Sequence, residues 1–160
     1  MIFLKFQWKK LVVCLLLPLA VGGLAAFLTR NSMDLFAMVK KPPLSPPGWL
    51  FPVVWTILYL LMGFASYLVL VAEKPGRTAW KFYLAQLAFN FVWPILFFHL
   101  QMYLLSFVWL LLLWMLILVT ILWFTRSSRL AGYLLIPYLL WVTFAGYLNL
   151  GIYILNQNMH

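Results

Sequence analysis

Five apolar runs, each long enough to cross a membrane, divide almost the whole chain between them. They cover about residues 11–28, 50–72, 80–98, 103–124 and 130–155. A hydrocarbon core about 30 Å thick is crossed by about 20 helical residues, so each run can span it once. Backbone polar groups in lipid must pair within the protein, which restricts single apolar spans to helices. The sequence therefore predicts an all-α integral membrane bundle of five transmembrane helices.

Composition excludes a water-soluble fold. Of the 160 residues, 67% are hydrophobic and 8% are charged, whereas a soluble domain carries about 25% charged residues. No stretch is left for a second domain, so residues 1–160 are expected to form a single five-helix transmembrane domain. The first run follows three lysines, as in a signal peptide, but it is long and ends in no clear cleavage site, which favours a retained helix.

The basic residues lie between the apolar runs and predict the orientation of the chain. With five spans, eight Lys and Arg side chains fall on the side of the N-terminus and three on the other side. Basic loops tend to stay in the cytoplasm, so the N-terminus is predicted to be cytoplasmic in a multi-pass protein of the bacterial cell membrane. The basic residues form no continuous patch, so no nucleic-acid partner is expected.

A proline-rich stretch lies in the connection between the first two helices, at about residues 29–48. It reads Lys40-Lys41-Pro42-Pro43-Leu44-Ser45-Pro46-Pro47-Gly48. Four prolines in six positions cannot extend a helix, and they stiffen the chain into an extended shape. Two interpretations stay open: a simple break between helices, or a rigid lid over the mouth of the bundle.

No Asp, Glu, Lys or Arg lies in the middle of any span. Ion-coupled pumps usually place such groups there, so a pump is disfavoured, and the chain offers no paired carboxylates for catalysis. With Cys14 as the only cysteine, a disulfide within the chain and a cysteine metal cluster are excluded, and no metal site is expected. His99, at the end of the third run, is a candidate haem ligand, although an ordinary histidine at the membrane surface is favoured there.

Neutral polar and aromatic residues recur at helical spacing on three of the runs. The second run carries Trp55, Tyr59, Met62 and Ser66; the third, Gln86, Asn90, Trp93 and Phe97; the fifth, Trp141, Ala145, Leu148, Asn149 and Ile152. Residues at this spacing share one helix face, and amide side chains in lipid need partners, so these faces should point inward. They predict either helix-to-helix hydrogen bonding and packing or an aromatic cavity for a flat, largely apolar ligand.

Three motifs follow one another along nearly the whole chain. They are Lys41-Pro42 with Pro46-Pro47 and then Val54-Trp55-x-x-Leu58-Tyr59-x-x-Met62-Gly63; Gln86-Leu87-x-x-Asn90-x-x-Trp93-Pro94-x-x-Phe97-Phe98; and Pro137-Tyr138-x-x-Trp141-x-x-Phe144-Ala145-x-x-Leu148-Asn149. Together they resemble the TspO/MBR family, the translocator proteins, which are also called tryptophan-rich sensory proteins or peripheral-type benzodiazepine receptors. The loop departs from the family pattern, since Leu44 replaces a usual Trp and Leu35-Phe36 lacks a usual Tyr hydroxyl.

This resemblance implies a five-helix bundle, often a homodimer, with a ligand cavity that opens toward the loop after the first helix. It implies a tetrapyrrole ligand, protoporphyrin IX or haem, and no obligatory cofactor. The implied ligand-binding residues, with Phe97 added from the same stripe, are Trp55, Tyr59, Gln86, Asn90, Trp93, Phe97, Trp141, Ala145 and Leu148. Candidates for pairing with the propionates are Arg30, Lys40 and Lys41.

The leading functional hypothesis is a membrane receptor or sensor that binds porphyrin or haem. The resemblance also suggests transport of the ligand, or its light- and oxygen-dependent breakdown, for which Trp55 and Trp141 would be the catalytic positions. The alternative is a transporter of porphyrin or of small lipid-like or sterol-like ligands. Expected partners are the tetrapyrrole, membrane lipid and a second copy of the chain.

Overall fold

Five helical spans build the protein, as the apolar runs predict. The computed structural model describes residues 6–74 and 76–157, and it contains no strand in that part of the chain. The spans that are long and apolar enough to cross a membrane, within those residues, are Trp8–Met38, Leu50–Leu70, Arg77–His99, Tyr103–Ser127 and Arg129–Leu155. The chain is therefore an all-helical, multi-pass integral membrane bundle.

Several spans are built from more than one helical element. In chain order the elements are α1 (Trp8–Thr29), η1 (Arg30–Ser32), α2 (Met33–Met38), α3 (Leu50–Leu70), α4 (Arg77–Pro94), η2 (Ile95–His99), α5 (Tyr103–Ser127), α6 (Arg129–Leu134) and α7 (Ile136–Leu155). The main difference from expectation is α2, which makes part of the connection after the first run helical. The extended stretch begins only at Val39, whose ψ is 152°.

Prolines account for two of the interruptions. A proline lacks the backbone N–H and its ring crowds the preceding turn, so it removes one bond of the α-helical ladder and favours an interruption there. Pro94 is followed by the wider π-helical turn η2, in which the Leu100 N–H donates to the Ile95 carbonyl at 2.9 Å. Pro137 lies just after the break between α6 and α7, where the Leu135 N–H donates back to Gly132 at 3.1 Å.

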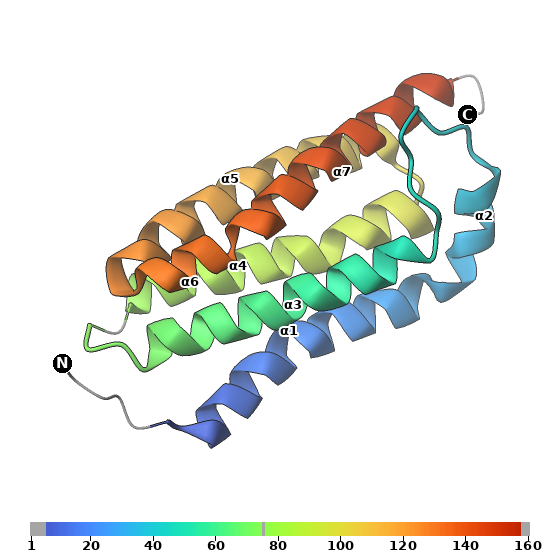
Figure 1. Cartoon of the computed structure of the whole chain (residues 1–160). Helices are drawn as coiled ribbons and strands as arrows, with labels where there is room; N and C mark the ends of the chain where they lie inside the picture. Colours follow the sequence, from blue (N-terminus) through green and yellow to red (C-terminus); the bar gives the residue numbers. More distant parts are fainter. Residues whose placement is uncertain (1–5, 75, 158–160) are drawn as a thin grey trace.

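The spans run alternately up and down along one elongated bundle, with the start of α1 and the end of α7 at opposite ends (Figure 1). Helix α1 packs closely on α3, α4 packs on α5, and α7 makes its closest backbone contacts with α5 and α6. Aromatic side chains bridge the wider space between α7 and α3; the Trp55 and Tyr138 rings, for example, meet at 6.1 Å between centroids.

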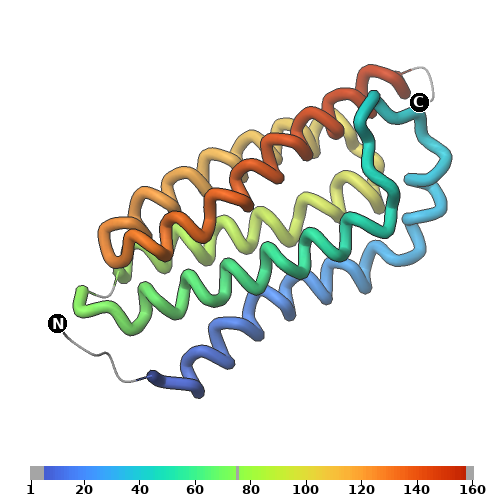
Figure 2. The backbone as a smooth tube through the Cα atoms, in the orientation of Figure 1, coloured from blue at the N-terminus to red at the C-terminus, as the bar shows by residue number. Residues whose placement is uncertain are grey.

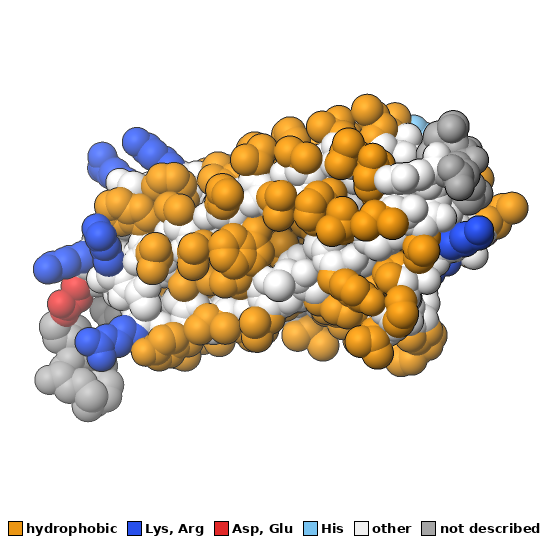
Figure 3. Space-filling view, turned by 90° about the horizontal axis from the view of Figure 1, so that it is seen from above, with side chains coloured by type: hydrophobic (Ala, Val, Ile, Leu, Met, Phe, Trp, Pro, Cys, Tyr) orange, Lys and Arg blue, Asp and Glu red, His pale blue; other side chains and the backbone are white. Residues whose placement is uncertain are grey.

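An apolar belt separates two basic ends of the bundle (Figure 3). One end carries the described basic residues Lys9, Lys10, Lys74, Arg77, Lys81, Arg126 and Arg129, and the opposite end carries Arg30, Lys40 and Lys41. Lys5, which also entered the orientation prediction, lies outside the described residues.

The proline-rich segment crosses the end of the bundle that carries Arg30, beside the last turns of α7 (Figure 2). We call residues 40–47 the lid loop. The Tyr147 hydroxyl donates to the Pro43 carbonyl at 2.7 Å, and Pro42 is buried directly against Gly151. Leu44 is 83% exposed at the tip of the loop, with a positive φ of 70°. The loop is thus fastened to one helix and covers the space beneath it.

Candidate functional site

A cavity of about 360 Å³, the main chamber, lies between α1, α3, α4 and α7 in the half of the bundle nearest the lid loop. Small-molecule pockets typically enclose about 300–1,000 Å³, so the main chamber is of ligand size. Its lining residues are Gly22, Ala25, Ala26, Thr29, Arg30, Met33, Phe51, Pro52, Trp55, Tyr59, Asn90, Trp93, Pro94, Phe98, Trp141 and Ala145.

Aromatic rings form two walls of the main chamber. On α3, Trp55 stacks on Tyr59 with centroids 5.5 Å apart and planes inclined by 29°. On α7, Trp141 lies edge-on to Phe51, with centroids 6.0 Å apart. The third side is almost bare, because α1 contributes Gly22, Ala25 and Ala26 there. A space between broad aromatic faces and a smooth helix backbone suits a flat apolar molecule.

A chain of hydrogen bonds runs from the main chamber into the bundle core. The Tyr59 hydroxyl donates to Asn90 Oδ1 at 2.9 Å, and Asn90 Nδ2 donates to the Tyr138 hydroxyl at 2.7 Å. The Tyr138 hydroxyl in turn donates to Gln86 Oε1 at 2.7 Å. Gln86 does not line the main chamber and stands behind Tyr138, so in this geometry it orients the chain of hydrogen bonds.

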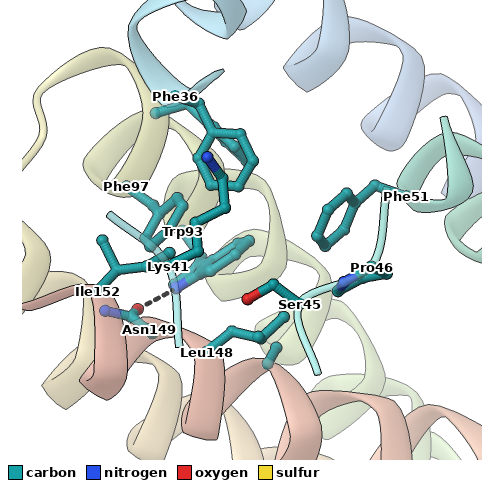
Figure 4. Close-up of a pocket in the computed structure, with 12 residues that line it drawn as sticks. Phe36, Lys41, Ser45, Pro46, Phe51, Trp93, Phe97, Leu148, Asn149 and Ile152 are labelled. Carbon is teal, nitrogen blue, oxygen red and sulfur yellow. Dashed lines mark hydrogen bonds between the residues drawn. The ribbon is translucent and has the colours of Figure 1, made fainter. Parts of the chain in front are cut away.

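A second, much smaller space lies directly under the lid loop, and we call it the upper compartment (Figure 4). It holds about 20 Å³, room for roughly one water molecule. Phe51, Trp93, Phe98 and Ala145 line both spaces and so form the partition between them. The Trp93 indole N–H donates to Asn149 Oδ1 at 3.1 Å, which fixes the largest ring of that partition.

Three basic residues at this end occupy different positions. Arg30 lines the main chamber, Lys41 lines the upper compartment, and Lys40 is exposed and lines neither space. Lys41 Nζ lies 4.7 Å from the centre of the Phe36 ring and donates to the Val39 carbonyl at 3.1 Å. Partial burial lowers the pKa of Lys41 from its ordinary value, because the charged form loses water contacts.

One buried polar group in the chamber wall, the indole N–H of Trp141, makes no hydrogen bond within the described part of the chain. A buried donor without a partner costs about 1–3 kcal/mol, and a bound acceptor would relieve that cost. Among the described residues no cluster of three potential metal ligands occurs. The site therefore offers stacking surfaces, a few neutral donors and two cations.

The structure brings most of the expected site residues together. Trp55, Tyr59, Asn90, Trp93, Trp141 and Ala145 line the main chamber, while Phe97 and Leu148 line only the upper compartment. His99 stands apart at the surface, with its Nδ1 atom 3.3 Å from the Ser32 hydroxyl. Ligand contact by the lining residues stays a prediction.

Several lining residues were missed by sequence reasoning. Gly22, Ala25 and Phe51 lie outside the polar and aromatic stripes, and Phe36 and Phe98 were named only within motifs, without a role at the site. The structure gives the reason for Gly22. A Cβ atom there would overlap the Tyr59 ring, so the position of Tyr59 on α3 requires a glycine on α1. That relation becomes visible only once the two helices are paired.

The chain is similar to known proteins along most of its length. The family model described as "TspO/MBR family" matches residues 14–155. The "Tryptophan-rich protein TspO" of Chlorobaculum tepidum is 40% identical over 94% of this chain and 98% of its own length. The protein of the same name from Archaeoglobus fulgidus is 40% identical over 92% and 97% of the two chains, and the "Translocator protein" of Bos taurus is 36% identical over 89% and 87%.

Proposed function

Because the chain belongs to the TspO/MBR family of membrane sensor and translocator proteins, we propose that it binds a porphyrin or haem in the main chamber and acts as a receptor or sensor for it. The observation that carries the proposal is the placement of Trp55 and Trp141 on different helices around one cavity. Flat macrocycles gain stacking energy from such rings.

The charge pattern fits the same class of ligand. The chamber has apolar walls for a macrocycle, and cations lie at its lid end in the form of Arg30 and Lys41. Carboxylates on a tetrapyrrole would pair with them. The positive-inside rule favours the more basic, opposite end as the cytoplasmic one, which would place the lid loop on the outer side of the cell membrane.

A titration with protoporphyrin IX tests the proposal. In detergent, Trp55→Ala combined with Trp141→Ala is expected to weaken porphyrin affinity by about tenfold or more, because two stacking surfaces are removed. Quenching of tryptophan fluorescence and the shift of the porphyrin absorption band report binding.

The matched control replaces two exposed tryptophans instead. Trp8 and Trp49 are 59% and 68% exposed and line neither space, so Trp8→Ala with Trp49→Ala should leave affinity unchanged. Equal affinity of the chamber variant and the wild type, with both proteins monodisperse and helical, would refute binding in the main chamber.

A further inference from the structure

Asn156, near the end of α7, makes an unusual set of contacts with the lid loop. Its Oδ1 atom accepts the Lys40 N–H at 3.0 Å, and its Nδ2 atom donates to the Lys40 carbonyl at 2.7 Å. The second Nδ2 hydrogen goes to the Ile152 carbonyl, also at 2.7 Å. Asn156 is 1% exposed, so this amide is buried and all of its hydrogens are used.

These bonds hold both backbone polar groups of a single residue, the N–H and the C=O of Lys40. An amide that binds the N–H and C=O of one residue fixes that peptide segment as a neighbouring β-strand would. Consecutive side chains of an extended segment point to different sides. Val39 is extended, and Lys41 is restricted to the extended region because a proline follows it. Holding Lys40 in place therefore decides which of two consecutive lysines turns inward.

The observed orientation follows this rule. Lys40 is exposed, whereas Lys41 lies among the walls of the upper compartment (Figure 4). A slip of the loop by one residue would reverse the two side chains. Neighbouring contacts resist such a slip, since Pro42 packs so closely on Gly151 that a Cβ atom at position 151 would lie 2.6 Å from Pro42 Cγ.

We propose that Asn156 is a positioning residue for ligand specificity: it fixes the register of the lid loop so that Lys41, and not Lys40, presents its ammonium group in the upper compartment. There it meets a carboxylate that the ligand bound in the main chamber extends past the partition between the two spaces. The inference rests on the proposed function for the identity of the ligand, but the register itself can be measured without any ligand. Lys41 uses two of its three N–H donors on the Val39 and Ala37 carbonyls, at 3.1 and 3.4 Å, which leaves one for a ligand.

The first experiment measures the register alone. In a Cys14→Ala background, Lys40→Cys and Lys41→Cys are compared for their rate of reaction with a charged, water-soluble maleimide. The Lys40→Cys thiol is expected to react several-fold faster. Adding Asn156→Leu, which keeps the side-chain size but removes the three hydrogen bonds, should bring the two rates together. Rates that stay as different as before would overturn the register role of Asn156.

The second experiment measures specificity with protoporphyrin IX and with its dimethyl ester, which lacks the carboxylates. Lys41→Met should lose about tenfold in affinity for the free acid and nothing for the ester, since one charge-assisted hydrogen bond is removed. Asn156→Leu should show the same selective loss, and the double variant should lose no more than either single one. Lys40→Met is the matched control and should bind both porphyrins as the wild type does.

The outcomes separate the two claims. A wild type that binds neither porphyrin refutes the proposed function, and the maleimide rates then decide the register claim by themselves. A wild type that binds acid and ester equally well refutes carboxylate recognition by Lys41. Should Asn156→Leu fail to fold, Asn156→Asp replaces it: it retains the acceptor for the Lys40 N–H, loses both donors, and is expected to lose part of the preference for the acid. Unchanged preference in Asn156→Asp would count against the proposal.

Discussion

Asn90 is a central residue of the polar core of the bundle. It accepts from the Tyr59 hydroxyl and donates to the Tyr138 hydroxyl, and so joins α3, α4 and α7 through one side chain. All three residues are buried. In a membrane interior no water replaces a lost partner easily, so the bonds of Asn90 contribute both to stability and to the shape of the chamber wall.

Asn90→Leu is expected to lower the free energy of unfolding by about 1–3 kcal/mol, because the Tyr59 hydroxyl loses its acceptor and the Tyr138 hydroxyl, which still donates to Gln86, loses its donor. Thermal or denaturant unfolding in detergent measures the loss. Thr56→Val serves as the control: the Thr56 hydroxyl is exposed and bonds only to its own helix, at Pro52, so a change below about 0.5 kcal/mol is expected. Equal stability of the two variants would show that the chain of hydrogen bonds adds nothing.

Single residues were predictable where helical spacing decides their direction. Trp55, Trp93 and Trp141 were placed on inward faces from spacing alone, and all three line the main chamber. Lys40 and Lys41 could not be told apart in the same way. Their directions depend on a contact with Asn156, 116 residues away in the sequence, and local pattern carries no information about such a distant partner.

At the scale of elements, the crossing of α1 and α3 is the tightest helix contact near the site. A Cβ atom on Gly63 would lie 2.7 Å from Leu15 Cα and 2.8 Å from the Cys14 carbonyl. Those neighbours are backbone atoms and cannot turn aside as a flexible side chain would. Small residues at such crossings let membrane helices approach closely, and this approach holds the bare wall of the main chamber in place.

Gly63→Ala is therefore expected to destabilise the bundle by about 1–3 kcal/mol, through forced separation of α1 and α3. The matched variant is Gly23→Ala, where no atom beyond the surrounding helix backbone lies within 4 Å of the added methyl group. That change should stabilise the protein by about 0.5–1 kcal/mol, since alanine is the better helix former. Unfolding in detergent compares the two, and a shift of the same sign in both variants would contradict the close crossing.

The five spans were the most predictable feature of the chain, because each is a long apolar run between polar segments, most of which carry Lys or Arg. The short helix α2 was missed, since Met33–Met38 is too brief for a periodic pattern. The π-helical turn η2 was missed as well: Pro94 marks a disturbance, but the sequence does not say whether the chain kinks, stops or widens there. Both elements border the spaces under the lid loop, at Phe36 and at Phe97 and Phe98.

At the scale of the whole molecule, the ligand space results from how the five spans are placed around one another. Helix α7 packs closely on α5 and stands farther from α3, and large rings bridge part of the interval. The sequence predicted that three polar and aromatic faces meet, but not how much volume remains between them. That volume depends on side-chain packing across helices, which one-dimensional pattern does not specify.

The structure of the protein with protoporphyrin IX bound, determined in lipid nanodiscs, tests the central claim most directly. We expect the macrocycle in the main chamber, in contact with Trp55 and Trp141, with one carboxylate within ion-pair distance of Lys41 Nζ under a lid loop still held by Asn156. A macrocycle bound on the lipid-facing surface or at the opposite basic end, with the main chamber unchanged, would contradict the account.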